Sequence, residues 1–150
     1  MSPEGSTVMF RRPAADVRPA AIVRFARKLQ RETARGRAFD CVIAGDAELR
    51  RLNRDFRGED SVTDVLSFQP ASRGGESHLG DLAISIQRAR AQAREFGHTT
   101  EQEIRILMLH GVLHLLGMDH ESDQGRMARA ERRWRAKLGL PGGLIERVRA

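Results

Sequence analysis

The amino-acid sequence predicts a single mixed α/β (α+β) domain over residues 1–150, in which about four strands pack with helices. Three observations predict this fold. Short apolar segments with strand character interleave with longer segments that have helical periodicity. The length of 150 residues is typical of one domain that buries a substantial core. One segment, 104–116, is apolar on almost every side, which indicates a buried central helix.

The first part of the chain is expected to alternate between strands and helices. A first strand is expected over 7–11, and a helix follows over about 19–35, with proline in its first turn and Gly36 as its stop. A second strand is expected over 39–44. The next helix is expected over 46–56, where an aspartate can cap the first turn.

The remainder is expected to contain two further strands and three further helices. Gly97 can stop the first of these helices, and Thr100 and Glu103 have the separation of a capping box that opens the second. The expected elements are a loop over 57–61, a strand over 64–68, an exposed turn over 70–77, a strand over 79–86, and helices over 87–96, 100–116 and 123–138.

Composition limits the classes of protein and of partner. The longest apolar stretch, 106–118, is too short for a membrane span, and the first seven residues lack the layout of a signal peptide. The single cysteine, Cys41, excludes an internal disulfide framework. We therefore expect a cytoplasmic protein that does not associate with membranes.

The net charge of +6 favours a polyanionic partner such as RNA. A candidate RNA-contact surface lies on the first long helix, where basic residues recur at helical spacing. Its members are Arg24, Arg27, Lys28, Arg31 and Arg35. A solvated helix face explains the same pattern, and 24 of the 26 basic residues are arginine, as a biased genome composition would also produce.

Two histidines interrupt the apolar central helix. His110 and His114 are four residues apart and therefore lie on one face. Buried imidazoles need partners, and a shared metal ion satisfies both. Gly117 permits a turn that brings His120 back toward them. The sequence thus predicts one zinc-type ion on His110, His114 and His120, with a fourth position open for catalysis; nickel or cobalt suits the same ligands.

The residue after the first histidine separates this site from that of a zinc protease. Metzincin proteases share the three-histidine spacing but place a glutamate there as general base. This chain has Gly111 instead. A substrate other than a peptide is therefore expected.

Four segments resemble one known family. They read HGVLHLLGMDH over 110–120, LNRDFRGED over 52–60, TDVLSF over 63–68 and LGDLAIS over 79–85. Together they resemble the bacterial YbeY proteins, and the resemblance extends over about 38–140. Family members usually have lysine at the position of Glu59, proline at that of Val62 and acidic residues where 124–126 lie.

The resemblance implies a zinc-dependent, single-strand-specific endoribonuclease. It implies action in the maturation of the 3′ end of 16S rRNA and in ribosome quality control, with rRNA, the ribosome or a small-subunit precursor as partner. It also implies that Arg57 is the functional arginine near the metal. Such a role is chemically reasonable, because a guanidinium can hold two oxygens of a phosphate whose negative charge increases during cleavage.

Two alternatives remain at this point. One is a ribosome-assembly factor whose metal is mainly structural. The other is a metal-dependent hydrolase of a different substrate, including peptides, although Gly111 argues against ordinary zincin chemistry.

Several other side chains have a structural interpretation beside a functional one. Asp119 can orient a metal-bound imidazole or cap a turn. His78 and His98 are not expected to bind the metal. Cys41 is expected to be a buried thiol in a strand, and Trp134 is expected to pack in the core.

Overall fold

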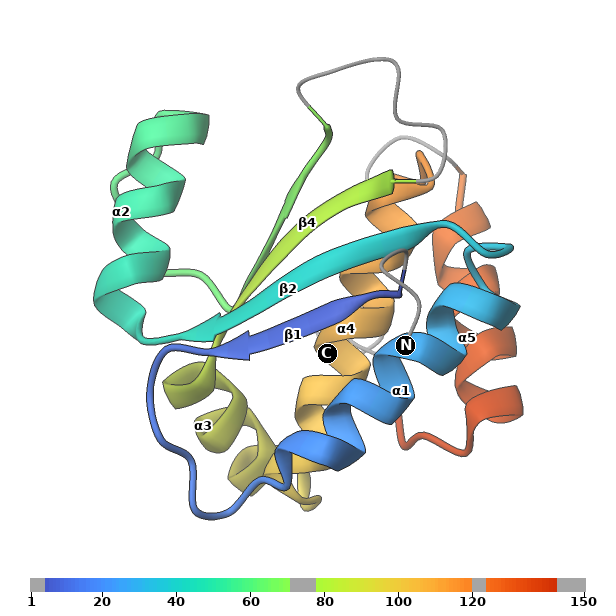
Figure 1. Cartoon of the computed structure of the whole chain (residues 1–150), viewed down its shortest axis with the longest axis horizontal. Coiled ribbons are helices and arrows are strands. Elements are labelled where there is room, and N and C mark those ends of the chain that lie inside the picture. The colour runs from blue at the N-terminus through green and yellow to red at the C-terminus, as the bar shows by residue number, and fades with distance from the viewer. Residues whose placement is uncertain (1–4, 71–77, 120–123, 143–150) are drawn as a thin grey trace.

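The computed structural model describes residues 5–70, 78–119 and 124–142, which form a single α+β domain (Figure 1). Four strands and five helices lie in the described residues. In chain order they are β1 (Thr7–Phe10), α1 (Pro19–Glu32), β2 (Ala38–Ala44), α2 (Asp46–Arg57), β3 (Val65–Phe68), β4 (His78–Ser85), α3 (Ile86–Phe96), α4 (Thr100–Leu115) and α5 (Arg126–Leu138).

The strands form one mixed sheet, as predicted. Their order is β1-β2-β4-β3. β2 pairs in parallel with both β1 and β4, whereas β3 runs antiparallel to β4 at the edge of the sheet. The expected turn over 70–77 lies mostly outside the described residues, because the description stops at residue 70 and resumes at 78.

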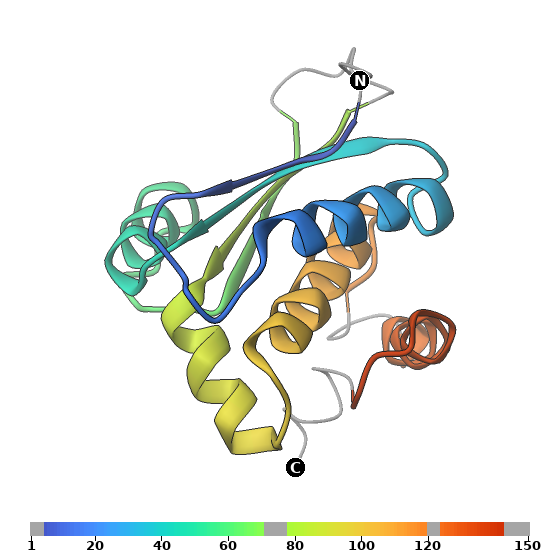
Figure 2. The same ribbon diagram turned by 60° about the horizontal axis from the view of Figure 1, so that its bottom comes forward.

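The two faces of the sheet have different coverings. In β2, Phe39, Cys41 and Ile43 belong to the main core, while Val42 and Ala44 belong to a smaller cluster on the opposite face. α1 and α4 cover the core face, and α2 lies on the opposite face (Figure 2). We call the face that carries α2 the outer face. Alternation of side chains along β2 thus separates a core from a second, smaller apolar layer.

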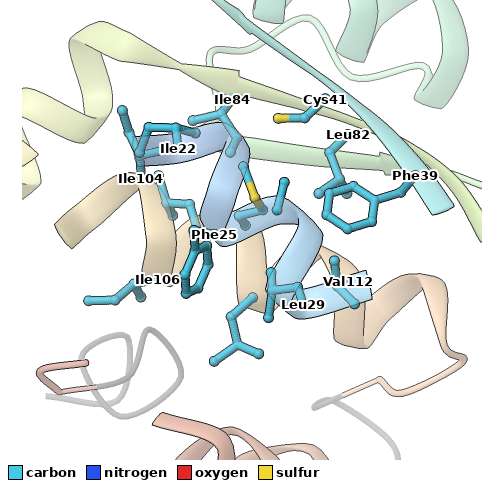
Figure 3. Close-up of a cluster of buried hydrophobic side chains, with 14 of the residues drawn as sticks. Ile22, Phe25, Leu29, Phe39, Cys41, Leu82, Ile84, Ile104, Ile106 and Val112 are labelled. Carbon is cyan, nitrogen blue, oxygen red and sulfur yellow. The ribbon is translucent and has the colours of Figure 1, made fainter. Parts of the chain in front are cut away.

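α4 is the central helix of the domain. Its side chains pack among residues of α1, β2 and β4, and several of these appear in the close-up of the core (Figure 3). Every residue from Ile106 to Val112 is buried. An all-round apolar sequence therefore corresponds, as predicted, to a helix enclosed by other elements.

Two helix ends differ from the expectation. α1 stops at Glu32 rather than near residue 35, because Arg35 and Gly36 take positive φ values of 55° and 90°. The capping box of α4 is formed by Thr99 and Gln102, one residue before the predicted pair. The Thr99 hydroxyl accepts a hydrogen bond from the Gln102 amide at 3.1 Å, and the Gln102 side chain accepts one from the Thr99 amide at 2.9 Å.

The boundaries around α2 also differ. The N-cap position is Gly45, and Asp46 lies inside the first turn, where its carboxylate accepts a hydrogen bond from the Ser85 hydroxyl at 2.6 Å. Arg57 was expected in a loop but is the last residue of α2. Gly58 ends the helix in the left-handed conformation, with φ 73°.

Three further expectations concern burial and membranes. Cys41 is buried in β2, and burial raises the pKa of its thiol. Trp134 is partly buried against the core. In the described part of the chain, no helix has the length and apolar character needed to cross a membrane.

Candidate active site

A cleft of about 650 Å³ lies where the end of α2, the following segment, β3 and the second half of α4 meet. Arg57, His110, His114 and Asp119 line it together. The structure therefore brings the predicted arginine and two of the predicted metal ligands to one cavity. The third predicted ligand, His120, lies outside the described residues.

The two described histidines face each other across one turn of α4. Their Nε2 atoms are 3.1 Å apart, and their ring centroids are 4.7 Å apart. The Gly117 turn that was predicted after α4 has φ 96°, and it places the Met118 carbonyl 2.9 Å from Nδ1 of His114. When Nδ1 donates to that carbonyl, Nε2 of His114 carries a lone pair directed at His110.

A buried acid stands behind the other histidine. Oε2 of Glu131, on α5, is 3.5 Å from Nδ1 of His110, and the two side chains are only 2% and 8% exposed. A carboxylate beside Nδ1 of an imidazole favours the proton on that nitrogen, which leaves Nε2 as the lone-pair donor.

The donor set fits a metal ion. Because Nδ1 of each histidine lies beside an acceptor oxygen, both Nε2 atoms carry lone pairs, and these lone pairs converge on one point. Only a cation or a shared proton makes that arrangement favourable. Two imidazole nitrogens bound to one tetrahedral zinc ion are separated by about 3.3 Å, given zinc–nitrogen bonds of about 2.0 Å. The observed separation of 3.1 Å is close to that value.

Close packing explains the glycine between the histidines. A Cβ atom at Gly111 would lie 2.6 Å from Cδ2 of Leu82 in β4, so a larger residue there requires the Leu82 side chain to move. The Gly111 carbonyl also accepts a hydrogen bond from the Ser67 hydroxyl of β3 at 3.2 Å. A glutamate at this position would have to displace the buried side chain of Leu82.

Arg57 is presented to the cleft by the end of α2. Just before it on the helix, the buried Asn53 fixes the following segment through a 3.1 Å hydrogen bond to the Ser61 carbonyl. The Arg57 side chain is exposed, and it makes no hydrogen bond or ion pair with any residue that the structure describes. Its guanidinium is therefore available to an anion in the cleft.

A second group of possible metal ligands lies on the outer face of the sheet. Asp40 of β2 with His78 and Asp81 of β4 offer ligand atoms that all lie within 4.8 Å of one another. Nε2 of His78 is 3.3 Å from Oδ1 of Asp81 and 4.0 Å from Oδ2 of Asp40. This group is compatible with a metal ion but does not include the predicted ligands. His98, in contrast, forms a buried pair with Glu103 at 2.6 Å.

The basic residues of α1 lie away from the cleft. α1 packs on the β1 side of the sheet, whereas β3, at the opposite edge, forms one wall of the cleft. Arg24 and Arg31 are exposed, Arg27 and Lys28 are half-buried, and none of these four lines the cleft. Their proposed contact with RNA stays a prediction about a separate surface.

The contact between Glu131 and His110 could not be predicted from the sequence. The sequence does indicate that Glu131 is buried, because it follows Met127 by one helical turn, and the structure buries both residues. An acid on the apolar face of an amphipathic helix indicates a buried polar partner. The identity of that partner depends on how α5 packs against α4.

Comparisons with known proteins agree with one another. The family model described as "Endoribonuclease YbeY" matches residues 15–139. The Endoribonuclease YbeY of Solibacter usitatus is 70% identical over 149 residues, 99% of each chain. That of Koribacter versatilis is 53% identical over 107 residues, which are 71% of this chain and 68% of the relative.

A solved structure has a similar fold. The solution structure of TM1509 from Thermotoga maritima superposes with a TM-score of 0.57 and 25% sequence identity, covering 85% of each chain. The sequence relatives and the structural neighbour thus point to the same kind of domain.

Proposed function

This chain belongs to the YbeY endoribonuclease family, and we propose that it is itself a metal-dependent endoribonuclease that cleaves single-stranded RNA. The proposal includes zinc as the metal, the 3′ end of 16S rRNA as the substrate, a part in ribosome quality control, and the cytoplasm as the location. One observation carries the catalytic part of the proposal: Arg57, His110 and His114 line the same cleft. The substrate, the part in quality control and the location rest on the family.

The role proposed for Arg57 follows from its charge and position. It is a cation at the end of α2, exposed in the cleft and without a carboxylate partner among the described residues. In phosphodiester cleavage, negative charge increases on the phosphoryl oxygens in the transition state. A guanidinium that donates two hydrogen bonds to these oxygens stabilises that charge and orients the phosphate.

The histidines are proposed as metal ligands. His110 and His114 supply two converging nitrogens, and His120 is proposed as the third ligand. A zinc ion bound there would act as a Lewis acid on the phosphate or lower the pKa of a bound water. Glu131 and the Met118 carbonyl are proposed to orient the two imidazoles through their Nδ1 atoms.

The experiment is cleavage of a labelled single-stranded rRNA fragment by metal-loaded protein. Arg57→Ala is expected to lower kcat by about 100-fold or more, and His114→Ala to abolish cleavage. Arg54→Ala, one turn earlier on α2 and paired with Asp55, is the matched control and should retain activity within about two-fold.

The alternative outcome is informative. A folded, metal-loaded parent protein that cleaves no RNA would contradict the proposal and favour the ribosome-assembly factor. An Arg57→Ala variant with parental kcat would contradict the role of the arginine alone.

A further inference from the structure

A second cavity, of about 610 Å³, opens on the outer face of the sheet beside α2. α2 covers only part of this face. Near its start, Leu49 is fully buried against Ala44, Leu66 and Ala83. Near its end the packing loosens, and a hollow remains between the helix and β2, β3 and β4.

The floor and one wall of this cavity are apolar and aromatic. Val42, Leu52 and Phe68 line it from the sheet and the helix. Phe56 lines it from the last turn of α2, with 70% of its surface exposed and its ring edge-on to Phe68 at 5.6 Å. An aromatic ring this exposed buries little area within the domain, so it contributes little to folding and is available to a ligand.

The cavity shares lining residues with the candidate active site. Arg57, Ser67 and Gln69 line both cavities. Arg57 follows Phe56 in the chain and lines the second cavity with it, so a phosphate held by the guanidinium lies beside the aromatic wall.

The second cavity combines a charged rim with an aromatic wall. Arg11, Glu48 and Asp81 stand at its rim, and Nε of Arg11 lies 3.8 Å from Oε2 of Glu48, so the charge of that carboxylate is partly neutralised. The carboxylate oxygens are acceptors for the exocyclic amino groups of bases. The aromatic wall offers a flat apolar surface for stacking. Single-stranded RNA presents unstacked bases that can enter such pockets.

We propose that the cavity lined by Phe56 and Phe68 is a nucleobase subsite that holds the base adjacent to the phosphate at Arg57. The inference rests on the proposed endoribonuclease function. It names Phe56 as a residue that binds substrate and explains a preference for single-stranded RNA, because a paired base cannot leave its stack to enter the pocket.

The test is a double-substitution cycle between protein and RNA. The proteins are the parent, Phe56→Ala and the control Phe96→Ala, which removes another exposed phenylalanine, at the end of α3. The RNAs are one single-stranded oligonucleotide with a mapped cleavage position, the same RNA with an abasic nucleotide next to that position on either side, and a control with a distant abasic nucleotide. KM, kcat and the Kd for RNA are measured for each pair.

A base in the pocket predicts a particular pattern. Phe56→Ala should raise KM and Kd roughly ten-fold with little change in kcat, as expected for the loss of one stacked base. For the parent, one adjacent abasic nucleotide should raise KM and Kd by a similar factor. For Phe56→Ala, the same abasic nucleotide should raise them no further. Phe96→Ala and the distant abasic nucleotide should change KM by less than about two-fold.

Other patterns would overturn the inference. A Phe56→Ala protein with parental KM and Kd, or losses that multiply with every abasic nucleotide, excludes a base at Phe56. A parent that self-associates through this face, and dissociates when Phe56 is changed, assigns the cavity to a second copy of the chain. A parent that binds RNA without cleaving it refutes the proposed function, and the Kd values of the parent and of Phe56→Ala for the unmodified RNA then still test whether Phe56 binds the strand.

Discussion

Oε2 of Glu131 lies 3.5 Å from Nδ1 of His110, and this contact joins α5 to the central helix at the wall of the active-site cleft. The carboxylate is in place to favour one tautomer of the imidazole and to hold the ring in one orientation. It has this position because α5 packs against α4 along a face that includes Met127, Ala130 and Glu131.

The first prediction concerns this contact. Glu131→Gln keeps the shape of the side chain but removes its charge, and we expect metal affinity to fall by about 10- to 100-fold while the protein remains folded. Competition with a fluorescent chelator measures the affinity. Glu95→Gln, on the exposed surface of α3, is the control. Unchanged affinity in Glu131→Gln would show that the carboxylate does not act on the metal ligand.

The second prediction separates the two possible metal positions. If the ion binds in the cleft, His114→Ala should lose it, whereas His78→Ala should retain one ion per chain, because His78 belongs to the group on the outer face. Metal content measured by mass spectrometry after dialysis decides between them. The reverse pattern would move the metal site to Asp40, His78 and Asp81.

The third prediction concerns the buried pair of His98 and Glu103, whose side chains are 7% and 0% exposed. His98→Leu removes one partner of Glu103, whose Oε1 lies 2.6 Å from Nε2 of His98, and we expect the free energy of unfolding to fall by about 3 kcal/mol. Denaturant titration measures the loss. His98→Leu combined with Glu103→Met should recover much of it, since two apolar side chains need no charge partner. A double variant less stable than His98→Leu would contradict this explanation.

The fourth prediction concerns acid. Hydrogen bonds and charge from Arg18 lower the pKa of Glu101 from 4.5 to about 2, and a pair with Arg90 lowers the pKa of Asp16 from 3.8 to about 2. A carboxyl group whose pKa is lowered by folding stabilises the protein above its unfolded pKa and loses that contribution as the pH falls through the folded value. Stability should therefore decline between about pH 4.5 and pH 2.

The variant that tests this is Glu101→Gln. It should lower the free energy of unfolding by about 1 kcal/mol at neutral pH and make the loss of stability at acid pH less steep. Three hydrogen bonds from Arg18, at 2.7, 2.9 and 3.0 Å, connect the starts of α1 and α4 through this carboxylate. Thermal melts across the acid range provide the measurement. A slope identical to that of the parent would assign the acid sensitivity to other groups.

The fifth prediction concerns Gly111. Gly111→Ala should destabilise the protein by about 1–3 kcal/mol, because its Cβ would lie 2.6 Å from Leu82. Leu82→Val in the same protein should relieve part of this loss by shortening the side chain that the new Cβ meets. Tm values of the parent, of Gly111→Ala and of the double variant form the comparison. Full stability in Gly111→Ala alone would show that α4 can move away from β4.

The sequence was sufficient for the elements whose pattern is local. The alternating residues of β2 and the all-round apolar character of α4 are set by which side chains enter the core, and that is visible in the order of the residues. Gly97 and Gly117 mark helix ends for a reason that is also local, since both take positive φ values that glycine adopts without strain. The pairing of His110 with His114 followed from helical geometry alone.

Tertiary contacts decided what the sequence could not. Thr99 with Gln102 and Thr100 with Glu103 are equally good capping boxes by spacing, and the choice falls to the first because Glu103 is buried against His98. The position of Arg57 at the end of a helix, and the hollow beside Phe56, depend on how far α2 extends over the sheet.

The burial of α4 has a kinetic consequence for the ligands that it carries. His110 and His114 belong to the helix around which the rest of the domain packs, and helices of that kind open only when the whole domain unfolds. His110 lies in the fully buried part of α4 and is held there until the domain unfolds, whereas His114 lies one residue before the end of the helix, beside a turn that is exposed at Gly117 and Asp119. We therefore expect a bound ion to exchange from the His114 end of the site.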